Sequence, residues 1–216
     1  MKPILFSTPM VQAILEGRKR QTRRVLKPQP LVHNEVIKMP IPVDEYSKIL
    51  KQYVKKGYTE IYTKGVLQGM IAPRCPFGEV GDTIWVRETW CDPSNTGYPI
   101  LYKADFPMVY RNDAEGEPDI VLKEEGYKWK PSIFMPKDAC RLFLKITNIR
   151  VERLQDISEL DAECEGAKKM PLEHLGGALP NHKSGFESLW QSINGKESWD
   201  SNPYVWVIEF EKIKNQ

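Results

Sequence analysis

The chain has 216 residues, enough for one domain with a substantial hydrophobic core or for one domain that carries insertions. Hydrophobic residues make up 41% and charged residues 28% of the sequence, close to the averages of globular proteins, so disorder is not the default expectation. The formal net charge of +2 does not by itself indicate a nucleic-acid-binding protein, so a cationic surface would have to be local.

Neither a membrane span nor secretion is expected. No run of about 18 apolar residues occurs, and the apolar stretch in residues 1–6 is too short for a signal peptide. The four cysteines form no CxxC pair, and none of them has a histidine at the spacing of a zinc finger. We therefore expect a cytoplasmic protein with reduced thiols, no metal site and no cofactor.

The first third of the chain predicts a strand, a helix and a proline-rich loop. The strand runs from Pro3 to Phe6, and the following helix has Thr8 as its N-cap and ends at Gly17. Residues 18–24 come next, in a loop or entering a strand. Residues 28–42 are rich in proline and predict a loop, and Asp44 to Lys56 has the periodicity of an amphipathic helix.

The middle of the chain predicts mainly β structure. A strong strand from Thr83 to Trp90 is paired with a hairpin partner from Tyr98 to Ala104. Residues 105–126 are polar and acidic and predict a long loop. The longest β signal runs from Ala139 to Leu154, and its apolar alternation shifts near Thr147, which indicates a bulge or bend.

The last third predicts two helices and a closing strand. One short helix has Ser158 as its N-cap and ends at Gly166. Ser184 and Glu187 have the spacing of a capping box for a second helix, and a strand from Tyr204 to Ile213 closes the chain. Long parallel βαβ spacing is absent, so we expect an α+β fold: a small mixed β-barrel with short helices packed around it.

A basic segment is the first candidate for function. Between residues 18 and 27 it holds six cationic side chains and no acidic one: Arg18, Lys19, Arg20, Arg23, Arg24 and Lys27. Guanidinium groups match phosphate oxygens with paired hydrogen bonds, so the segment could bind phosphate. The alternative is a solvated loop that complements the negative end of the preceding helix.

Three further features are candidates for function. Thr22 could be a nucleophile if Lys19 took its proton, and neighbouring arginines would favour the neutral lysine by lowering its pKa. The acidic helix that ends at Glu165 is either an exposed acidic face or the source of a general acid or base. Trp129 and Trp199 lie in polar loops, where an indole ring could stack on a nucleobase.

Several stretches together resemble the ASCH domain family of the PUA-like superfamily, in a form common in phage and prophage genomes. The matching stretches are Pro3 to Phe6, Ile14 to Lys19, Gln21 to Arg24, Cys75 to Gly78, Gly81-Asp82, Trp85 to Trp90, Pro131 to Ile133, Met135-Pro136, Arg150 to Ser158, Ala162 with Glu165-Gly166, Trp190, Ile193 to Gly195, Asn202-Pro203, and Val205 to Ile208. They cover most of residues 1–216 as a single domain, with insertions at about 30–72 and 105–126.

The resemblance implies a PUA-like β-barrel with a helix-lined cleft that binds RNA or acts on nucleosides. One branch of the family resembles an amidohydrolase of N4-acetylcytidine, and Lys19, Thr22 and Glu165 fall on its catalytic positions. The implied roles are Lys19 as the base toward Thr22, Thr22 as the nucleophile, and Glu165 as acid and base at the leaving nitrogen. The chain is about twice as long as those small enzymes.

Three hypotheses follow. The first is a protein that binds RNA or a modified nucleoside in a cationic cleft around Lys19, Thr22 and Glu165. Further contacts in that hypothesis come from Arg18, Arg20, Arg23, Arg24, Arg87, Trp129 and Trp199. The second is a hydrolase that uses the same cleft to cleave an acyl-amide on a base or an RNA phosphodiester. The third is a phage accessory protein that acts through a phage or host protein partner.

Overall fold

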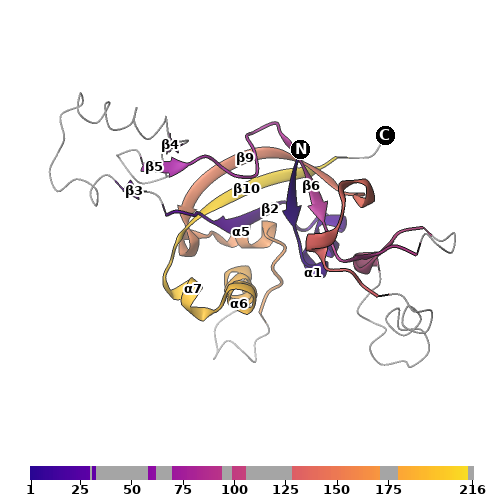
Figure 1. Cartoon of the computed structure of the whole chain (residues 1–216). Helices are drawn as coiled ribbons and strands as arrows, with labels where there is room; N and C mark the ends of the chain where they lie inside the picture. Colours follow the sequence, from indigo (N-terminus) through magenta and orange to yellow (C-terminus); the bar gives the residue numbers. More distant parts are fainter. Residues whose placement is uncertain are drawn as a thin grey trace.

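The structure is a computed structural model that describes residues 1–29, 31–32, 58–61, 70–93, 99–105, 128–170 and 180–213 (Figure 1). Its centre is a five-stranded sheet in the order β1-β6-β9-β10-β2. The strands are β1 (Lys2–Leu5), β6 (Thr83–Arg87), β9 (Phe143–Arg153), β10 (Tyr204–Lys212) and β2 (Gln21–Val25). β1 pairs with β6 in parallel, and the other neighbours are antiparallel.

The long strands β9 and β10 form the spine of this sheet and arch across the molecule (Figure 1). β10 is buried on both faces: Trp206 and Ile208 belong to one core cluster, and Val205 and Val207 belong to another. Alternate side chains of a strand point to opposite faces, so β10 separates the two cores. This explains its nearly continuous apolar sequence.

The bulge predicted in the longest β segment is confirmed. Ile146 pairs with Phe210 and Asn148 with Glu209, which leaves Thr147 as the extra residue between two pairs that are consecutive on β10. Such an insertion bends a strand and increases its twist. The bend contributes to the curvature of the sheet.

The curved sheet brings its two edge strands, β1 and β2, close to each other. Arg24 on β2 donates a hydrogen bond from Nη2 to the backbone oxygen of Leu5 on β1, at 2.9 Å. The described strands therefore form an α+β fold with a strongly curved sheet, and full closure into a barrel stays a prediction.

The helices cover both faces of the sheet. They are α1 (Thr8–Leu15), α5 (Glu159–Cys164), α6 (His182–Asn194) and α7 (Lys196–Asp200). Val11 and Ile14 of α1 pack into the core on one face, whereas Phe186 and Trp190 of α6 pack into the core on the other. None of the described helices is both long and apolar enough to cross a membrane.

The predicted helix starts were right in one case and wrong in two. Ser158 caps α5 by accepting a hydrogen bond from Asp161 N, as expected. For α1 the predicted N-cap Thr8 is wrong, because the extended residue before the helix is Ser7. The predicted capping box at residues 184–187 is also wrong: α6 begins one turn earlier, where the Asn181 side chain accepts from Ser184 N at 2.8 Å.

Smaller elements surround the central sheet. The region predicted as an insertion contains a three-stranded antiparallel sheet of β3 (Leu31–Val32), β5 (Met70–Pro73) and β4 (Tyr58–Ile61). The predicted pairing of the strand Thr83 to Trp90 with Tyr98 to Ala104 is wrong over most of its length, because β6 pairs with β1 and β9 instead. A separate short hairpin follows, made of β7 (Trp90–Cys91) and β8 (Leu101–Tyr102). The predicted helix at 44–56 and residues 106–126 of the predicted loop lie outside the described residues.

Single 3-10 turns complete the described chain. They are η2 (Lys103–Asp105), η4 (Ser132–Phe134), η5 (Lys137–Ala139) and η6 (Leu154–Asp156). The turn η4 positions the loop that reaches the cavity described below, and Arg87 holds it by donating from Nη1 to Ile133 O at 3.1 Å.

Candidate functional site

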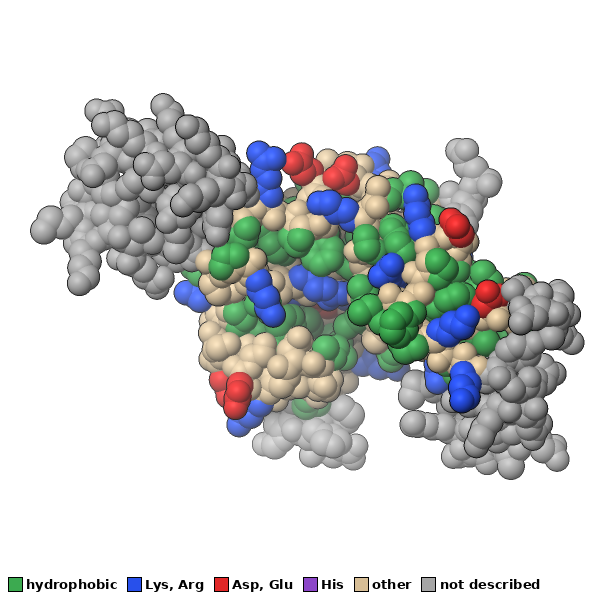
Figure 2. Space-filling model, in the orientation of Figure 1, with side chains coloured by type: hydrophobic (Ala, Val, Ile, Leu, Met, Phe, Trp, Pro, Cys, Tyr) green, Lys and Arg blue, Asp and Glu red, His purple; other side chains and the backbone are tan. Residues whose placement is uncertain are grey.

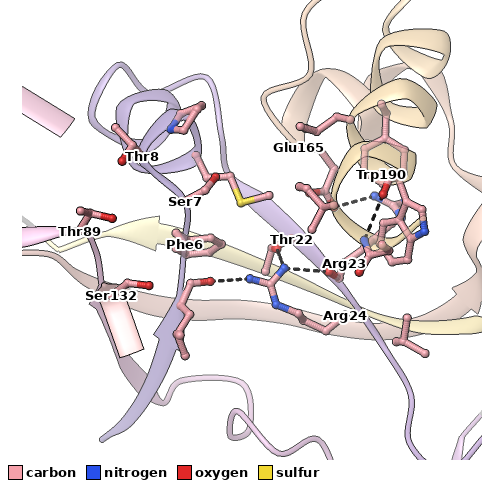
Figure 3. A pocket seen from close by; sticks show the side chains of 18 of the residues that line it. Phe6, Ser7, Thr8, Thr22, Arg23, Arg24, Thr89, Ser132, Glu165 and Trp190 are labelled. Carbon is pink, nitrogen blue, oxygen red and sulfur yellow. Dashed lines mark hydrogen bonds and ion pairs between the residues drawn. The ribbon is translucent and has the colours of Figure 1, made fainter. Parts of the chain in front are cut away.

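A cavity of about 700 Å³ lies where the two edge strands of the sheet approach each other. Its lining comes from the end of β1 and the first turn of α1, from β2, from the loops at Thr89 and Pro131-Ser132, from Glu165, and from one face of α6. Figure 3 shows Thr22, Arg23 and Arg24 on β2, with Phe6 on one side and Trp190 on the other. The volume is typical of small-molecule sites.

The walls of this cavity are aromatic and aliphatic. Phe6 comes from the residue after β1, and Phe186, Leu189, Trp190 and Ile193 come from α6. These four residues of α6 are spaced i, i+3, i+4 and i+7, so they form one face of the helix. That face packs the core at its buried side and lines the cavity at its edge, with Ile193 53% exposed at the rim.

The floor of the cavity is polar. The Thr22 side chain is almost fully buried, and its Oγ1 accepts a hydrogen bond from Arg24 Nη1 at 3.0 Å. The Arg24 guanidinium also lies 5.3 Å from the centroid of the Phe6 ring. Burial lowers the pKa of Arg24, and the nearby Glu165 carboxylate partly opposes that shift. Arg24 thus fixes the position of the hydroxyl that the resemblance assigns as nucleophile.

Two cations hold the carboxylate of Glu165 at this floor. Lys19 Nζ donates to Glu165 Oε2 at 2.8 Å and to the Glu165 backbone oxygen at 2.9 Å. Arg23 Nη1 donates to Oε1 at 3.0 Å. The residues are far apart in sequence, and an antiparallel bridge between Lys19 and Glu165 joins their backbones. The structure thus brings together the lysine and the glutamate that the sequence singled out.

The clamp that Lys19 and Arg23 form on the Glu165 carboxylate belongs to a larger ionic network. Arg23 also contacts Glu152 and lies 3.7 Å from Asp161 Oδ2. Arg150 bonds the same two carboxylates, at 3.1 Å to Glu152 and 2.8 Å to Asp161. Buried ion pairs require good geometry to offset the loss of hydration, and hydrogen-bonded networks restrict the conformations of their members. Among the described residues, Arg23 Nε is the one buried nitrogen of this network without a partner. The network therefore orients Glu165 before any ligand arrives.

The environment of Lys19 lowers the pKa of its ammonium group. Burial lowers the pKa of Lys19, and the positive charges of Arg24 and Arg23 lower it further, while Glu165 raises it. The net direction is downward, which is the shift a lysine needs to act as a base near neutral pH. Among the described residues, however, Lys19 Nζ hydrogen-bonds to Glu165 and makes no direct bond to Thr22.

The other predicted cations lie outside this cavity. Arg18 is 41% exposed and donates to Glu16 and to Gly166 O. Arg20 is exposed, with Nη2 3.6 Å from Cys164 Sγ. Arg87 stacks on the Trp85 ring, 4.9 Å from its centroid. The basic segment is therefore divided among several environments instead of forming one continuous phosphate-binding surface.

The two tryptophans predicted to stack on a base also lie apart from the cavity lining. Trp199 packs edge-on against Phe186, with ring centroids 6.3 Å apart, at the margin of the α6 core cluster. Trp129 is half-buried, and Lys103 Nζ lies 5.7 Å from its ring centroid. The rings of Phe6 and Trp190 occupy the place at the cavity that these tryptophans were expected to fill.

The surface on the side seen in Figure 2 carries many Lys and Arg side chains between exposed apolar ones, and most Asp and Glu side chains lie toward its margin. Among the described residues, no group of three or more His, Cys, Asp and Glu side chains is placed to hold a metal ion. The four cysteines are free thiols.

Comparison with known protein families, curated proteins and solved structures gives no match for this chain.

Proposed function

We propose that the cavity between β2 and α6, called the first cavity below, binds the base of a modified nucleoside or of RNA. The observation that carries the proposal is the combination of aromatic walls, Phe6 and Trp190, with a polar floor of Thr22 and Arg24. A nucleobase is a flat ring with hydrogen-bonding groups at its edge, so its faces suit the walls and its edge suits the floor. The resemblance to the ASCH family supports the same class of ligand.

Arg24 is the main candidate for recognition of the base edge. Its guanidinium has five N–H donors, and three hydrogen bonds occupy it in the structure: one to Thr22 Oγ1 and two to the backbone oxygens of Arg23 and Leu5. The remaining donors can reach an acceptor such as a pyrimidine O2 or an acyl oxygen.

A second candidate function is hydrolysis of an acyl-amide on the base. It is favoured by one observation: a buried lysine with a lowered pKa lies beside Glu165 at the floor that holds Thr22. In this reaction Thr22 Oγ1 attacks the acyl carbon and neutral Lys19 takes the hydroxyl proton. The Glu165 carboxylate then accepts that proton from Lys19 and delivers it to the leaving nitrogen as the C–N bond breaks, which leaves the acyl group as an ester on Thr22. Water then releases the acyl group from Thr22. The bond between Lys19 and Glu165 must open for Lys19 to reach the hydroxyl.

The test uses N4-acetylcytidine with the wild type, Thr22→Ala and Thr89→Ala. Thr89 lines the same cavity from the opposite loop, so it is a matched control for loss of a threonine side chain. If the protein is a hydrolase, the wild type and Thr89→Ala release cytidine, and Thr22→Ala loses at least about 100-fold in turnover while it still binds the nucleoside.

The other outcomes are equally informative. If no variant turns the nucleoside over but the wild type binds it, the cavity is a recognition site and the protein is a binding module. If the wild type neither binds nor hydrolyses N4-acetylcytidine and also fails to bind single-stranded RNA, the proposed function is wrong. RNA cleavage that Thr22→Ala abolishes would identify the phosphodiester as the substrate bond.

A further inference from the structure

A second cavity, of about 530 Å³, shares Glu165 with the first. Its lining comes from α1, from residues 165–170 and from the face of α6 that carries Ser188 and Ser192. Four residues line both cavities: Pro9, Met10, Glu165 and Leu189. The two cavities are therefore neighbours that share one wall.

The second cavity is cationic. Its lining holds three cationic residues, Arg18, Lys168 and Lys169, and two carboxylates, Glu16 and Glu165. Glu16 pairs with Arg18, and the two oxygens of Glu165 are bound to Lys19 and Arg23. Both carboxylates are thus compensated, which leaves Lys168 and Lys169 as the net charge of the second cavity.

These cations have donors left for a ligand. Arg18 uses Nε and Nη2 on Glu16 and one N–H of Nη1 on Gly166 O, so two of its five N–H groups remain. Lys168 and Lys169 are exposed, and the positive charge of Lys169 contributes to lowering the pKa of the nearby Glu159 carboxylate. The arrangement suits an anion with several oxygens, because each cation can supply a separate charge-assisted hydrogen bond.

Close backbone packing fixes the segment that carries the lysines. A Cβ on Gly185 of α6 would lie 1.8 Å from Lys168 O, so α6 can approach the segment only with glycine at that position. The Ala167 oxygen lies 2.7 Å from His182 Nδ1, and a Cβ on Gly166 would lie 3.0 Å from Lys19 Cβ. The backbone of residues 166–168 is therefore packed between α6 and Lys19, the residue that precedes β2 by two positions.

We infer that the second cavity binds a phosphate group of the nucleotide whose base enters the first cavity, through Lys168, Lys169 and Arg18. This inference rests on the proposed function and makes it more specific: the preferred ligand is a nucleotide or a nucleic-acid strand instead of a free nucleoside. A phosphate from a strand and one from a mononucleotide have the same chemistry here, and the experiment separates them.

The experiment compares the full chain with Lys168→Ala/Lys169→Ala, and with Lys145→Ala/Lys212→Ala as a control. Lys145 and Lys212 lie on neighbouring strands, are exposed and line neither cavity. All proteins also carry Thr22→Ala, so that hydrolysis does not consume the ligand. Affinities are measured for N4-acetylcytidine, its 5′-monophosphate and a short single-stranded RNA that contains it. In parallel, amide NMR shifts of residues 166–169 are followed with tripolyphosphate alone.

The expected result is that the monophosphate binds about 10-fold more tightly than the nucleoside at low salt, and that the double substitution at 168 and 169 removes this advantage. Affinity for the nucleoside stays unchanged, and the control behaves as the parent. If the strand is the preferred ligand, RNA binds more tightly than the monophosphate, and the double variant reduces its salt slope by about 0.7 for each phosphate that is no longer neutralised.

Two results would overturn the inference: tripolyphosphate leaves the shifts of residues 166–169 unchanged, or the advantage of the monophosphate survives in the double variant. A third result separates the two proposals. If tripolyphosphate shifts these amides only when the lysines are present, but neither nucleoside nor nucleotide binds, the anion site stands and the function proposed for the first cavity fails.

Discussion

Replacement of Glu165 by glutamine should destabilise the protein strongly. The carboxylate is 4% exposed and holds the buried cations Lys19 and Arg23, one on each oxygen. The glutamine side chain can accept a hydrogen bond from one of these cations through its amide oxygen. Its NH2 group must then face the other cation, so that two donors meet without an acceptor. Loss of one partner from a buried ion pair costs about 3–5 kcal/mol. For a chain of this size, that lowers Tm by about 6–20 °C.

The loss should also depend on pH, and the sign follows from Lys19. Glu165 raises the pKa of Lys19 against the effect of burial, so Glu165→Gln lowers that pKa further below its ordinary value of 10.5. The unfolded chain then keeps a proton on Lys19 at pH values where the folded variant has released it. The Lys19 contribution to stability therefore rises with pH between the lowered folded pKa and about 10.5, and this pH window is wider in the variant than in the wild type.

The assay is urea unfolding at several pH values for Glu165→Gln, Lys19→Met and the double variant. The double variant removes the buried ammonium as well as its partner, so it should recover part of the loss, with a coupling free energy of about 1–3 kcal/mol. A cost below about 1 kcal/mol for Glu165→Gln, with the same pH dependence as the wild type, would refute the clamp as described.

Three further predictions concern the surrounding framework. Asn181→Ala removes the N-cap of α6 and should cost about 1 kcal/mol in urea unfolding, whereas a helix start at Ser184 would leave stability unchanged. Gly185→Ala places a Cβ against Lys168 O and should lower the thermal midpoint by several degrees, a loss that the exposed helix position Ser192→Ala should not produce. Burial opposes ionisation of Asp161, but the Ser158 hydroxyl and nearby arginines outweigh it and hold its pKa below the usual range. Its contribution to stability is therefore lost as pH falls through that pKa, and Asp161→Asn should flatten the acid limb of the stability curve.

Features that are encoded locally could be predicted from sequence alone. The break in alternation at Thr147 indicates the bulge in β9, because a change of period in one strand is visible without its partner. Ser158 is recognisable as a cap because its hydrogen-bond partner is three residues away. The proximity of Lys19 and Glu165 is suggested only by resemblance, since nothing in their local sequence indicates a contact across 146 positions.

Features that depend on distant partners are not predictable in this way. The start of α6 at Asn181 is supported by the Glu159 carboxylate, which accepts from His182 N at 2.7 Å and Lys183 N at 3.1 Å. Neither bond is visible in the helix sequence, whose later capping-box pattern looks complete. Arg23 was expected to contact a ligand phosphate, but its charge is largely taken up by carboxylates more than 120 residues away.

The lysines of the second cavity could not be identified from the sequence either, because their role also depends on residues far away in the chain. Lys168 and Lys169 lie in the loop just after α5 and Gly166, where two charged residues are ordinary. They become a candidate site only because α6 packs against their backbone and places them beside Glu165. The helical spacing of Trp190 indicates a core residue, and in the structure this side chain is both buried and part of the cavity wall.

The central claim is that a nucleobase occupies the cavity between β2 and α6. The most direct measurement is NMR shift mapping of the isotope-labelled protein titrated with N4-acetylcytidine. We predict concentration-dependent shifts for the Thr22 amide, the Arg24 side chain and the Trp190 indole, with smaller changes at Val80, which is exposed and outside the cavity lining. Shifts confined to other surfaces, or no shifts at millimolar nucleoside, would contradict the claim.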